Sequence, residues 1–166
     1  MDQNMDQNAE TNSIIYIQNW PGQYKPIVTK IMRLFSASCH PEFYLLIVVI
    51  LYFFKKISIL QLFIIYSSQI IVGIIKYLVK RPRPCDDAQG KIIRLEPMSL
   101  DHYSFPSGHT LNAFLLSIIL KKNLGIDLSI ISYLVGLSRV YLGVHYPSDI
   151  LGGILLAKII LNFFQD

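Results

Sequence analysis

The chain has 166 residues, of which 52% are hydrophobic and only 16% are charged. Soluble domains carry about 25% charged residues, so this composition and a mean hydropathy of +0.43 disfavour a soluble globular domain and favour a multi-pass membrane protein. The net charge of +4 does not indicate nucleic-acid binding, because several basic residues lie at the ends of apolar runs, where they can reach lipid headgroups.

The N-terminal residues 1–13 are polar and begin with the tandem repeat MDQNMDQN. This composition predicts a disordered, solvated tail and lacks the basic-then-apolar pattern of a signal peptide. Residues 14–166 are expected to form a single membrane-embedded domain. Within 14–38, the helical spacing of apolar residues between Ile27 and Phe35 predicts either an interfacial helix or a short first span.

Five apolar runs follow, and they predict the membrane-spanning part of the chain. They cover residues 43–54, 57–79, 105–120, 126–144 and 150–164. A full span needs about 20 residues, so 57–79 is long enough by itself and 43–54 must borrow from its flanks. The runs are longer than ordinary strands and lack the alternation of a barrel. The sequence therefore predicts an all-α, multi-pass transmembrane bundle of five to six helices.

The order of these spans determines which polar segments share a membrane face. The run 57–79 carries Lys76 near its end, and the polar loop 80–104 stays on that face. The next two runs cross away and back, so His145 and Asp149 return to the face of Lys76. Three polar clusters that are distant in sequence are therefore expected at one surface.

The first cluster is "KYLVKRPRP", which contains Lys76 and Arg83. The two prolines end the helix, so Arg83 is expected on a rigid extended turn. Read alone, the cluster is typical of a basic helix end that anchors at the headgroups. Lys80 and Arg81 are expected to have this anchoring role.

The second cluster is "FPSGHT", which precedes an apolar helical run. A helix N-terminus with free N–H groups suits an anion; Ser107 adds a hydroxyl donor and Gly108 lets an oxyanion approach the backbone. His109 is expected in the first turn, beside this pocket. The alternative is a simple serine cap with an interfacial histidine.

The third cluster is "SRVYLGVHYPSD". Asp149 follows His145 by four residues, so one helical turn would let the carboxylate orient the imidazole and leave its other nitrogen as a nucleophile. Arg139 can bind phosphate oxygens in bidentate fashion. One alternative is a structural ion pair between Arg139 and Asp149.

A metal site is the other alternative for these clusters. Its ligands would be His109, His145 and Asp149, with Asp101 or His102. Three nearby cations would repel a divalent metal, which disfavours this interpretation.

Ionisable groups inside a membrane protein are usually functional. Together the three clusters fit one catalytic site, with three cations that bind an anion, an oriented nucleophile and a second histidine that acts as an acid.

The motifs "K-x6-RP", "PSGH" and "SR-x5-H-x3-D" resemble the three-part signature of the type-2 phosphatidic acid phosphatase superfamily. All three parts are complete and in order, over roughly residues 57–164, and the chain resembles the membrane-embedded lipid phosphatases of bacteria. The resemblance implies that His145 forms a phosphohistidine, that Asp149 orients it, and that His109 protonates the leaving oxygen and then activates water. It also implies phosphate binding, without metal or cofactor, by Lys76, Arg83, Ser107, Gly108 and Arg139.

The protein is therefore expected to be a metal-independent lipid phosphatase. Its expected partners are a lipid phosphate substrate and the bilayer, and nucleic acid is not among them. Undecaprenyl pyrophosphate or phosphatidylglycerophosphate is favoured as substrate because the site loops are short, with phosphatidate and lipid A phosphate as other candidates. The alternatives are a lipid-linked phosphotransferase and a non-catalytic anion or headgroup-binding protein. The positive-inside count is a draw, so only the resemblance indicates a bacterial cytoplasmic (inner) membrane with the site on the extracytoplasmic face.

Overall fold

The structure, a computed structural model, describes residues 2–88, 90–97 and 102–162, and these residues are predominantly helical. Within them the only pairing of β type is an isolated bridge between Pro82 and Tyr103. The helices are α1 (Asp2–Asn19), η1 (Gly22–Tyr24), α2 (Lys25–Ser38), α3 (Pro41–Phe53), α4 (Ile59–Val79), α5 (Pro84–Asp87), α6 (Gly108–Leu124), α7 (Ser129–Tyr141) and α8 (Pro147–Asn162). The predicted all-α fold is confirmed.

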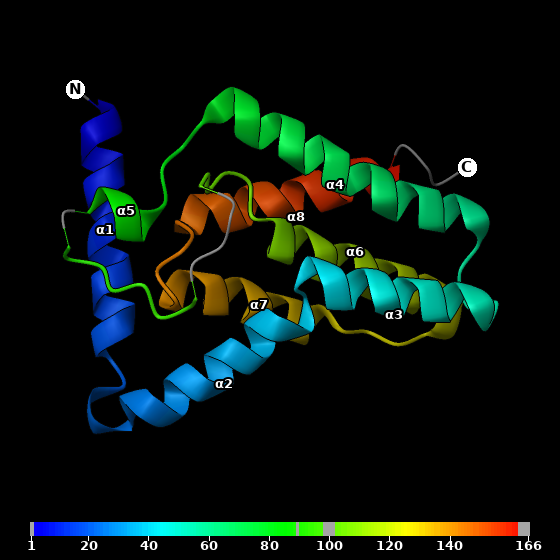
Figure 1. The fold of residues 1–166 in the computed structure, drawn as a ribbon, viewed down its shortest axis with the longest axis horizontal. Coiled ribbons are helices and arrows are strands. Elements are labelled where there is room, and N and C mark those ends of the chain that lie inside the picture. The colour runs from blue at the N-terminus through cyan, green and yellow to red at the C-terminus, as the bar shows by residue number, and fades with distance from the viewer. Residues whose placement is uncertain (1, 89, 98–101, 163–166) are drawn as a thin grey trace.

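Helix α6 lies at the centre of the bundle. It packs against α7 and α8 and also contacts α3 and α4, while α2 covers α7. Leu111, Leu115 and Ile119 are fully buried on α6 because residues four apart share one face of a helix. Figure 1 shows α1 lying across one end of the molecule, transverse to α6, α7 and α8.

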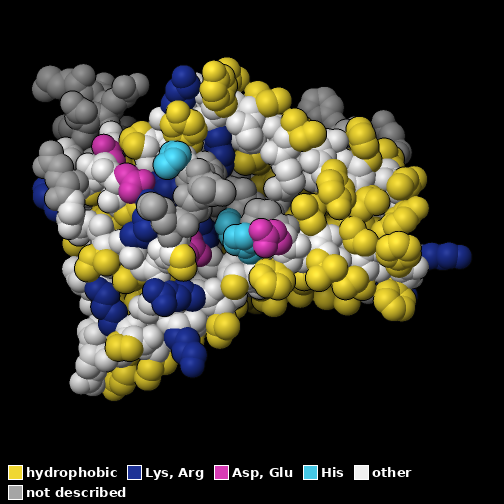
Figure 2. All heavy atoms as spheres, viewed as in Figure 1, with side chains coloured by type: hydrophobic (Ala, Val, Ile, Leu, Met, Phe, Trp, Pro, Cys, Tyr) yellow, Lys and Arg dark blue, Asp and Glu magenta, His cyan; other side chains and the backbone are white. Residues whose placement is uncertain are grey.

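The surface is divided between hydrophobic and basic side chains. On the face shown in Figure 2, hydrophobic side chains cover the half that carries α3 and α4, and most lysines and arginines lie over the half with α1, α2 and α5. On α4, Phe63, Ile70 and Leu78 are largely exposed. Large exposed apolar surface of this extent is typical of contact with lipid.

Helix α4, with 21 residues, is by itself long and apolar enough to cross a membrane, and α2 with α3 passes the same test as one span bent by 48°. Helices α6, α7 and α8 have 17, 13 and 16 residues. The helix within the predicted run 126–144 is shorter than the run for local reasons. The carboxylate of Asp127 accepts a hydrogen bond from the Ser129 amide at its start, and Gly143 has φ +77° just past its end, a conformation that favours glycine.

The N-terminal segment differs from the expected disordered tail over 1–13. Of these residues, Met1 lies outside the described part of the chain, and residues 2–13 belong to α1. Four side chains at helical spacing join α1 to the rest of the protein. Gln7 donates a hydrogen bond to Asp87, and Glu10 accepts one from Arg81. Ile14 is fully buried, and Gln18 donates to the carbonyls of Ile93 and Tyr141. Composition did not reveal this face because three of its four residues are polar.

Candidate active site

One pocket collects residues from all three sequence clusters. It has a volume of about 260 Å³ and lies where the C-terminal ends of α4 and α7 meet the N-terminal ends of α6 and α8. Its lining includes six of the expected residues, together with residues of α4 and the α2–α3 junction. The lining residues are Lys76, Arg83, Gly108, His109, Arg139 and His145, with His40, Gln69, Val72 and Gly73.

The N-terminus of α6 is built as the sequence predicted, with Ser107 as its cap. The Ser107 hydroxyl accepts hydrogen bonds from the Thr110 amide at 3.4 Å and the Thr110 hydroxyl at 2.9 Å. The Ser107 amide donates to the Asp149 carbonyl at 3.0 Å, which joins the start of α6 to the start of α8. Ser107 is fully buried and lies behind the pocket lining, whereas Gly108 and His109 line it.

His145 and Asp149 form the expected pair at the α7–α8 junction. The Nδ1 atom of His145 lies 3.4 Å from Oδ2 of Asp149, which also accepts a hydrogen bond from the Tyr146 amide at 2.8 Å. Both side chains are almost fully buried. Asp149 therefore lies on the far side of the imidazole from the pocket, where it can hold the orientation of the ring.

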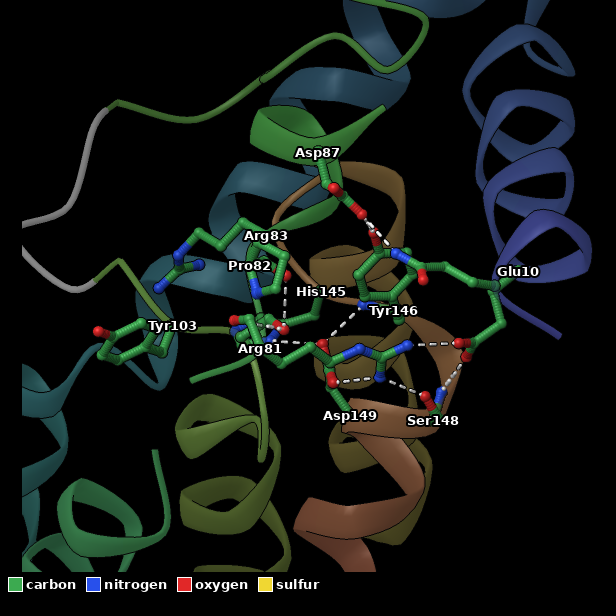
Figure 3. A network of polar contacts seen from close by, with 12 residues as sticks. Glu10, Arg81, Pro82, Arg83, Asp87, Tyr103, His145, Tyr146, Ser148 and Asp149 are labelled. Atoms are coloured by element: carbon green, nitrogen blue, oxygen red, sulfur yellow. Dashed lines mark hydrogen bonds and ion pairs between the residues drawn. The ribbon is translucent and has the colours of Figure 1, made fainter. Parts of the chain in front are cut away.

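Arg81 contacts this pair, although the sequence assigned it to headgroup anchoring. Its guanidinium lies 2.8 Å from Oδ1 of Asp149 and 2.6 Å from Oε2 of Glu10, and it covers the ring of Tyr146 at 4.0 Å (Figure 3). Burial raises the pKa of Tyr146 to about 12, and the Asp87 carboxylate, which accepts a hydrogen bond from the Tyr146 hydroxyl, contributes to this rise. The sequence gives no signal for this role of Arg81, because alternation in an extended RPRP segment would place Arg81 on the same side as Arg83, whereas the two side chains point in opposite directions (Figure 3).

The three expected phosphate-binding cations are held by separate partners. Lys76 donates to the Tyr103 carbonyl at 2.7 Å, and Arg83 donates to the Val144 carbonyl at 3.2 Å. These two main-chain oxygens help to hold the ammonium and guanidinium groups at the pocket wall.

Arg139 has an acidic partner that the sequence did not identify. It forms an ion pair with Glu96 at 2.6 Å and also bonds the Ser36 hydroxyl. The alternative of a structural pair between Arg139 and Asp149 is therefore wrong. Arg139 pairs with Glu96, and the arginine that pairs with Asp149 is Arg81.

His109 projects from the first turn of α6 into the pocket. Its Nε2 atom is buried and makes no hydrogen bond within the described residues, and its ring meets that of His40 edge-on with centroids 5.7 Å apart. A second pocket of about 390 Å³ shares His40, His109 and Arg139 with the first and is also lined by Arg33 and Glu96. His40 was not predicted, since it lies outside the motifs.

The alternative metal site finds no support in the described residues. No three His, Cys, Asp or Glu side chains among residues 2–88, 90–97 and 102–162 are grouped so that they could hold a metal ion. Asp101, one of its candidate ligands, lies outside the described residues. Asp149 has the Arg81 guanidinium on one oxygen, a position unsuited to a cation.

Proteins of known name and structure resemble this chain in sequence and fold. The chain is 27% identical to phosphatidylglycerophosphatase B of Bacillus subtilis over 98% of its length and 81% of the relative. It is 38% identical to an undecaprenyl-diphosphatase of Sulfolobus acidocaldarius over 63% of its length and 52% of that relative. A crystal structure of a transmembrane PAP2-type phosphatidylglycerolphosphate phosphatase from Bacillus subtilis superposes with a TM-score of 0.70 at 27% identity, covering 95% of this chain and 87% of that one.

The sequence model of the PAP2 superfamily matches residues 57–165. This range contains every residue that the three motifs contribute to the pocket, while α1, α2 and α3 lie before it. The match covers well over half of the chain and agrees with the structural similarity over nearly all of it. The chain is therefore a member of the PAP2 superfamily.

Proposed function

We propose that this protein is an integral-membrane, metal-independent lipid phosphatase that cleaves the terminal phosphate of a lipid diphosphate or of phosphatidylglycerophosphate. The observation that carries the proposal is the lining of one pocket of about 260 Å³ by three histidines, one lysine and two arginines from segments that lie far apart in the chain. An anion-binding protein would use the cations but would not need His145 backed by Asp149.

The chemistry proceeds in two steps at phosphorus. In the first, a ring nitrogen of His145 forms a bond to phosphorus while the bond to the leaving oxygen breaks, and His109 gives that oxygen its proton. In the second, water attacks the phosphohistidine, His109 takes a proton from the water, and inorganic phosphate leaves as the bond to His145 breaks. Asp149 keeps the His145 ring oriented through both steps.

Positive charge on the pocket wall stabilises the transferring phosphoryl group. Lys76, Arg83 and Arg139 bind its equatorial oxygens, and the α6 N-terminus adds the main-chain N–H of Gly108. Ser107, behind the lining, caps the helix that presents this N–H. A terminal phosphate carries about two negative charges. Three cations and a helix N-terminus are sufficient to balance it without a metal.

The second pocket supports a position for the leaving group. In-line displacement puts the nucleophile and the leaving oxygen on opposite sides of phosphorus. The larger pocket is lined by His109 and Arg139 but not by His145, so the rest of the headgroup lies there, next to Arg33 and His40. The carboxylates of Glu42 and Glu96 also line this pocket, so a second phosphate would bind on the Arg33 side. A substrate with two phosphates agrees with the substrates named for the relatives of Bacillus subtilis and Sulfolobus acidocaldarius.

A phosphate-release assay on purified protein in detergent tests the proposal. The substrates are undecaprenyl pyrophosphate, phosphatidylglycerophosphate, phosphatidate and lipid A phosphate, each supplied alone and with or without a chelator. We expect inorganic phosphate from the first two at the higher rates, and a chelator effect below about twofold because no step uses a metal. Phosphate release that needs a second lipid acceptor would indicate a phosphotransferase instead.

The histidines are tested individually. We expect His145→Ala and His109→Ala each to lower kcat by at least about a thousandfold, since both are needed in each turnover, while the variants remain folded. The matched control is His102→Ala, because His102 is exposed and lies outside both pockets. Full activity of His145→Ala would overturn the mechanism.

A further inference from the structure

We propose that Arg81 and Glu10 form a positioning pair for the catalytic histidine, with Arg81 holding Asp149 and Glu10 holding Arg81. Arg81 and Glu10 act through Asp149 and do not touch the substrate. The inference rests on the proposed function, because it assigns a role to the residues behind His145.

The carboxylate of Asp149 is held at both oxygens. Oδ2 accepts from the Tyr146 amide at 2.8 Å and faces the His145 ring at 3.4 Å, and Oδ1 lies 2.8 Å from the Arg81 guanidinium. The side chain of Asp149 is fully buried. A buried carboxylate is costly without a charged partner, and Arg81 is the cation that contacts it within the described residues.

The Arg81 guanidinium is itself fixed in orientation. One terminal nitrogen donates to Asp149 and to the Ser148 hydroxyl at 2.6 Å, and the other donates to Glu10 at 2.6 Å. The plane of the group lies over the Tyr146 ring. Figure 3 shows Arg81 between the α8 N-terminus and α1, pointing away from Arg83 and the substrate pocket.

Glu10 completes the arrangement from α1. Its Oε2 accepts from Arg81, and its Oε1 accepts from the Ser148 amide at 2.8 Å in the first turn of α8. An acidic side chain at a helix N-terminus is favourable, so Glu10 stabilises the start of α8 as well as the guanidinium. Glu10 lies outside the region that matches the PAP2 superfamily, 57–165, so the N-terminal helix adds a residue that the motifs do not include.

Loss of the Arg81 charge leaves the Asp149 carboxylate buried without its ion-pair partner. The carboxylate then turns away or takes up a proton, and in either case the His145 ring no longer faces a negatively charged oxygen at 3.4 Å. The substrate phosphate still meets Lys76, Arg83 and Arg139 in the pocket. The inference therefore predicts a defect in kcat with little change in KM.

The first test compares three variants by steady-state kinetics on the best substrate of the panel. We expect Arg81→Gln to lower kcat about 10- to 100-fold, as is typical for a residue that orients a catalytic group, with KM changed less than about threefold. Arg81→Lys keeps the charge beside Asp149 but loses the second nitrogen that reaches Glu10, so it should recover only part of kcat. The matched control is Arg94→Gln, which removes an arginine from the same loop and breaks its ion pair with Asp86; its kcat should equal that of the unchanged protein.

The second test uses Glu10→Gln, which keeps the size of a partly exposed side chain. We expect kcat to fall about 3- to 10-fold in the unchanged background and not to fall further when Arg81 is already glutamine, because coupled residues are not additive. Asp127→Asn, at the opposite end of the molecule, is the control for loss of an acid. The melting temperature of each variant reports whether it is folded.

Several outcomes would overturn the inference. They are an unchanged kcat in Arg81→Gln, an equal fall in Arg94→Gln, or an additive effect of Glu10→Gln in the Arg81→Gln background. If His145→Ala is inactive while Arg81→Gln is fully active, the positioning pair fails and the proposed function stands. If His145→Ala is fully active, the proposed function fails first.

Discussion

Arg139 has two possible partners, the Glu96 carboxylate that it contacts and the phosphate that it is proposed to bind. The pair with Glu96 and the bond to Ser36 fix one terminal nitrogen of the guanidinium. Its Nε atom is buried without a hydrogen bond in the described part of the chain. The fork geometry of arginine therefore matters, because one branch is used by the protein and the rest of the group remains for the substrate.

This arrangement predicts that Arg139→Lys is not a conservative change. A lysine can replace the charge at Glu96, but all its donors lie on one nitrogen and cannot reproduce the planar fork that reaches Glu96 and the phosphate from separate nitrogens. We expect kcat/KM for the best lipid substrate to fall about 10- to 100-fold, or about 1.4–2.8 kcal/mol, with most of the loss in KM. Arg94→Lys is the matched control; equal effects in the two variants would show that the guanidinium of Arg139 has no special role.

The residues that the sequence predicted for the pocket differ in kind from those that it missed. Lys76, His109 and His145 follow from motif spacing and from the direction in which each span crosses. Glu96 pairs with Arg139 and lines the second pocket, and His40 lines both pockets. Both come from segments outside the motifs, and no local pattern encodes such contacts. Sequence reasoning therefore found the groups proposed to react and Asp149, which lies within one helical turn of His145, but missed the partners that come from segments far apart in the chain.

At the scale of elements, the packing of α8 on α6 depends on Gly153. A Cβ atom at this position would lie 2.7 Å from the Ser107 carbonyl oxygen and 3.3 Å from the Leu111 amide nitrogen. Both neighbours are backbone atoms of the first turn of α6, which cannot rotate away as a side chain can. The two helices approach closely here because glycine has no side chain, and the approach lies directly behind the proposed phosphate-binding turn.

We therefore expect Gly153→Ala to destabilise the protein by about 1–3 kcal/mol, as overpacking does. The measurement is the melting temperature in detergent, with an expected fall of roughly 2–12 °C. Gly73→Ala on α4 is the control, because a Cβ there would meet nothing within 4 Å, and it should leave the melting temperature unchanged or raise it. A Gly153→Ala protein as stable as the control would contradict this account.

The helices themselves were predictable to different extents. Hydropathy located α3, α4, α6, α7 and α8, because each carries a long apolar run. The ends of the helices differ from the ends of the runs where a local group sets the boundary, as Asp127 does at the start of α7. Helix α1 was not predictable from composition, since its contacts with the rest of the protein are mostly polar. Polar contacts have no hydropathy signal, so a segment that folds through them resembles a solvated tail.

At the scale of the whole molecule, the crossing pattern places two sets of loops at opposite ends of the bundle. The loop after α4 and the α7–α8 junction meet at the pocket, whereas the α3–α4 and α6–α7 turns lie at the other end and carry Lys55, Lys56, Lys121 and Lys122. Since lysines are found on both sets of loops, charge does not orient the protein in the membrane. The proposed substrates are lipids, so the pocket end must lie at a headgroup plane.

Cysteine labelling tests this topology and the proposed extracytoplasmic site together. The native thiols of Cys39 and Cys85, which are free, are first replaced by alanine, and the unlabelled background is the control. Lys91→Cys then reports on the pocket end and Lys122→Cys on the opposite end, since both positions are exposed. With a membrane-impermeant maleimide on right-side-out spheroplasts, we expect Lys91→Cys to be labelled at once and Lys122→Cys only after permeabilisation. Labelling of both from one side would contradict the crossing pattern, whereas the reverse order would keep the pattern and place the pocket at the cytoplasmic face.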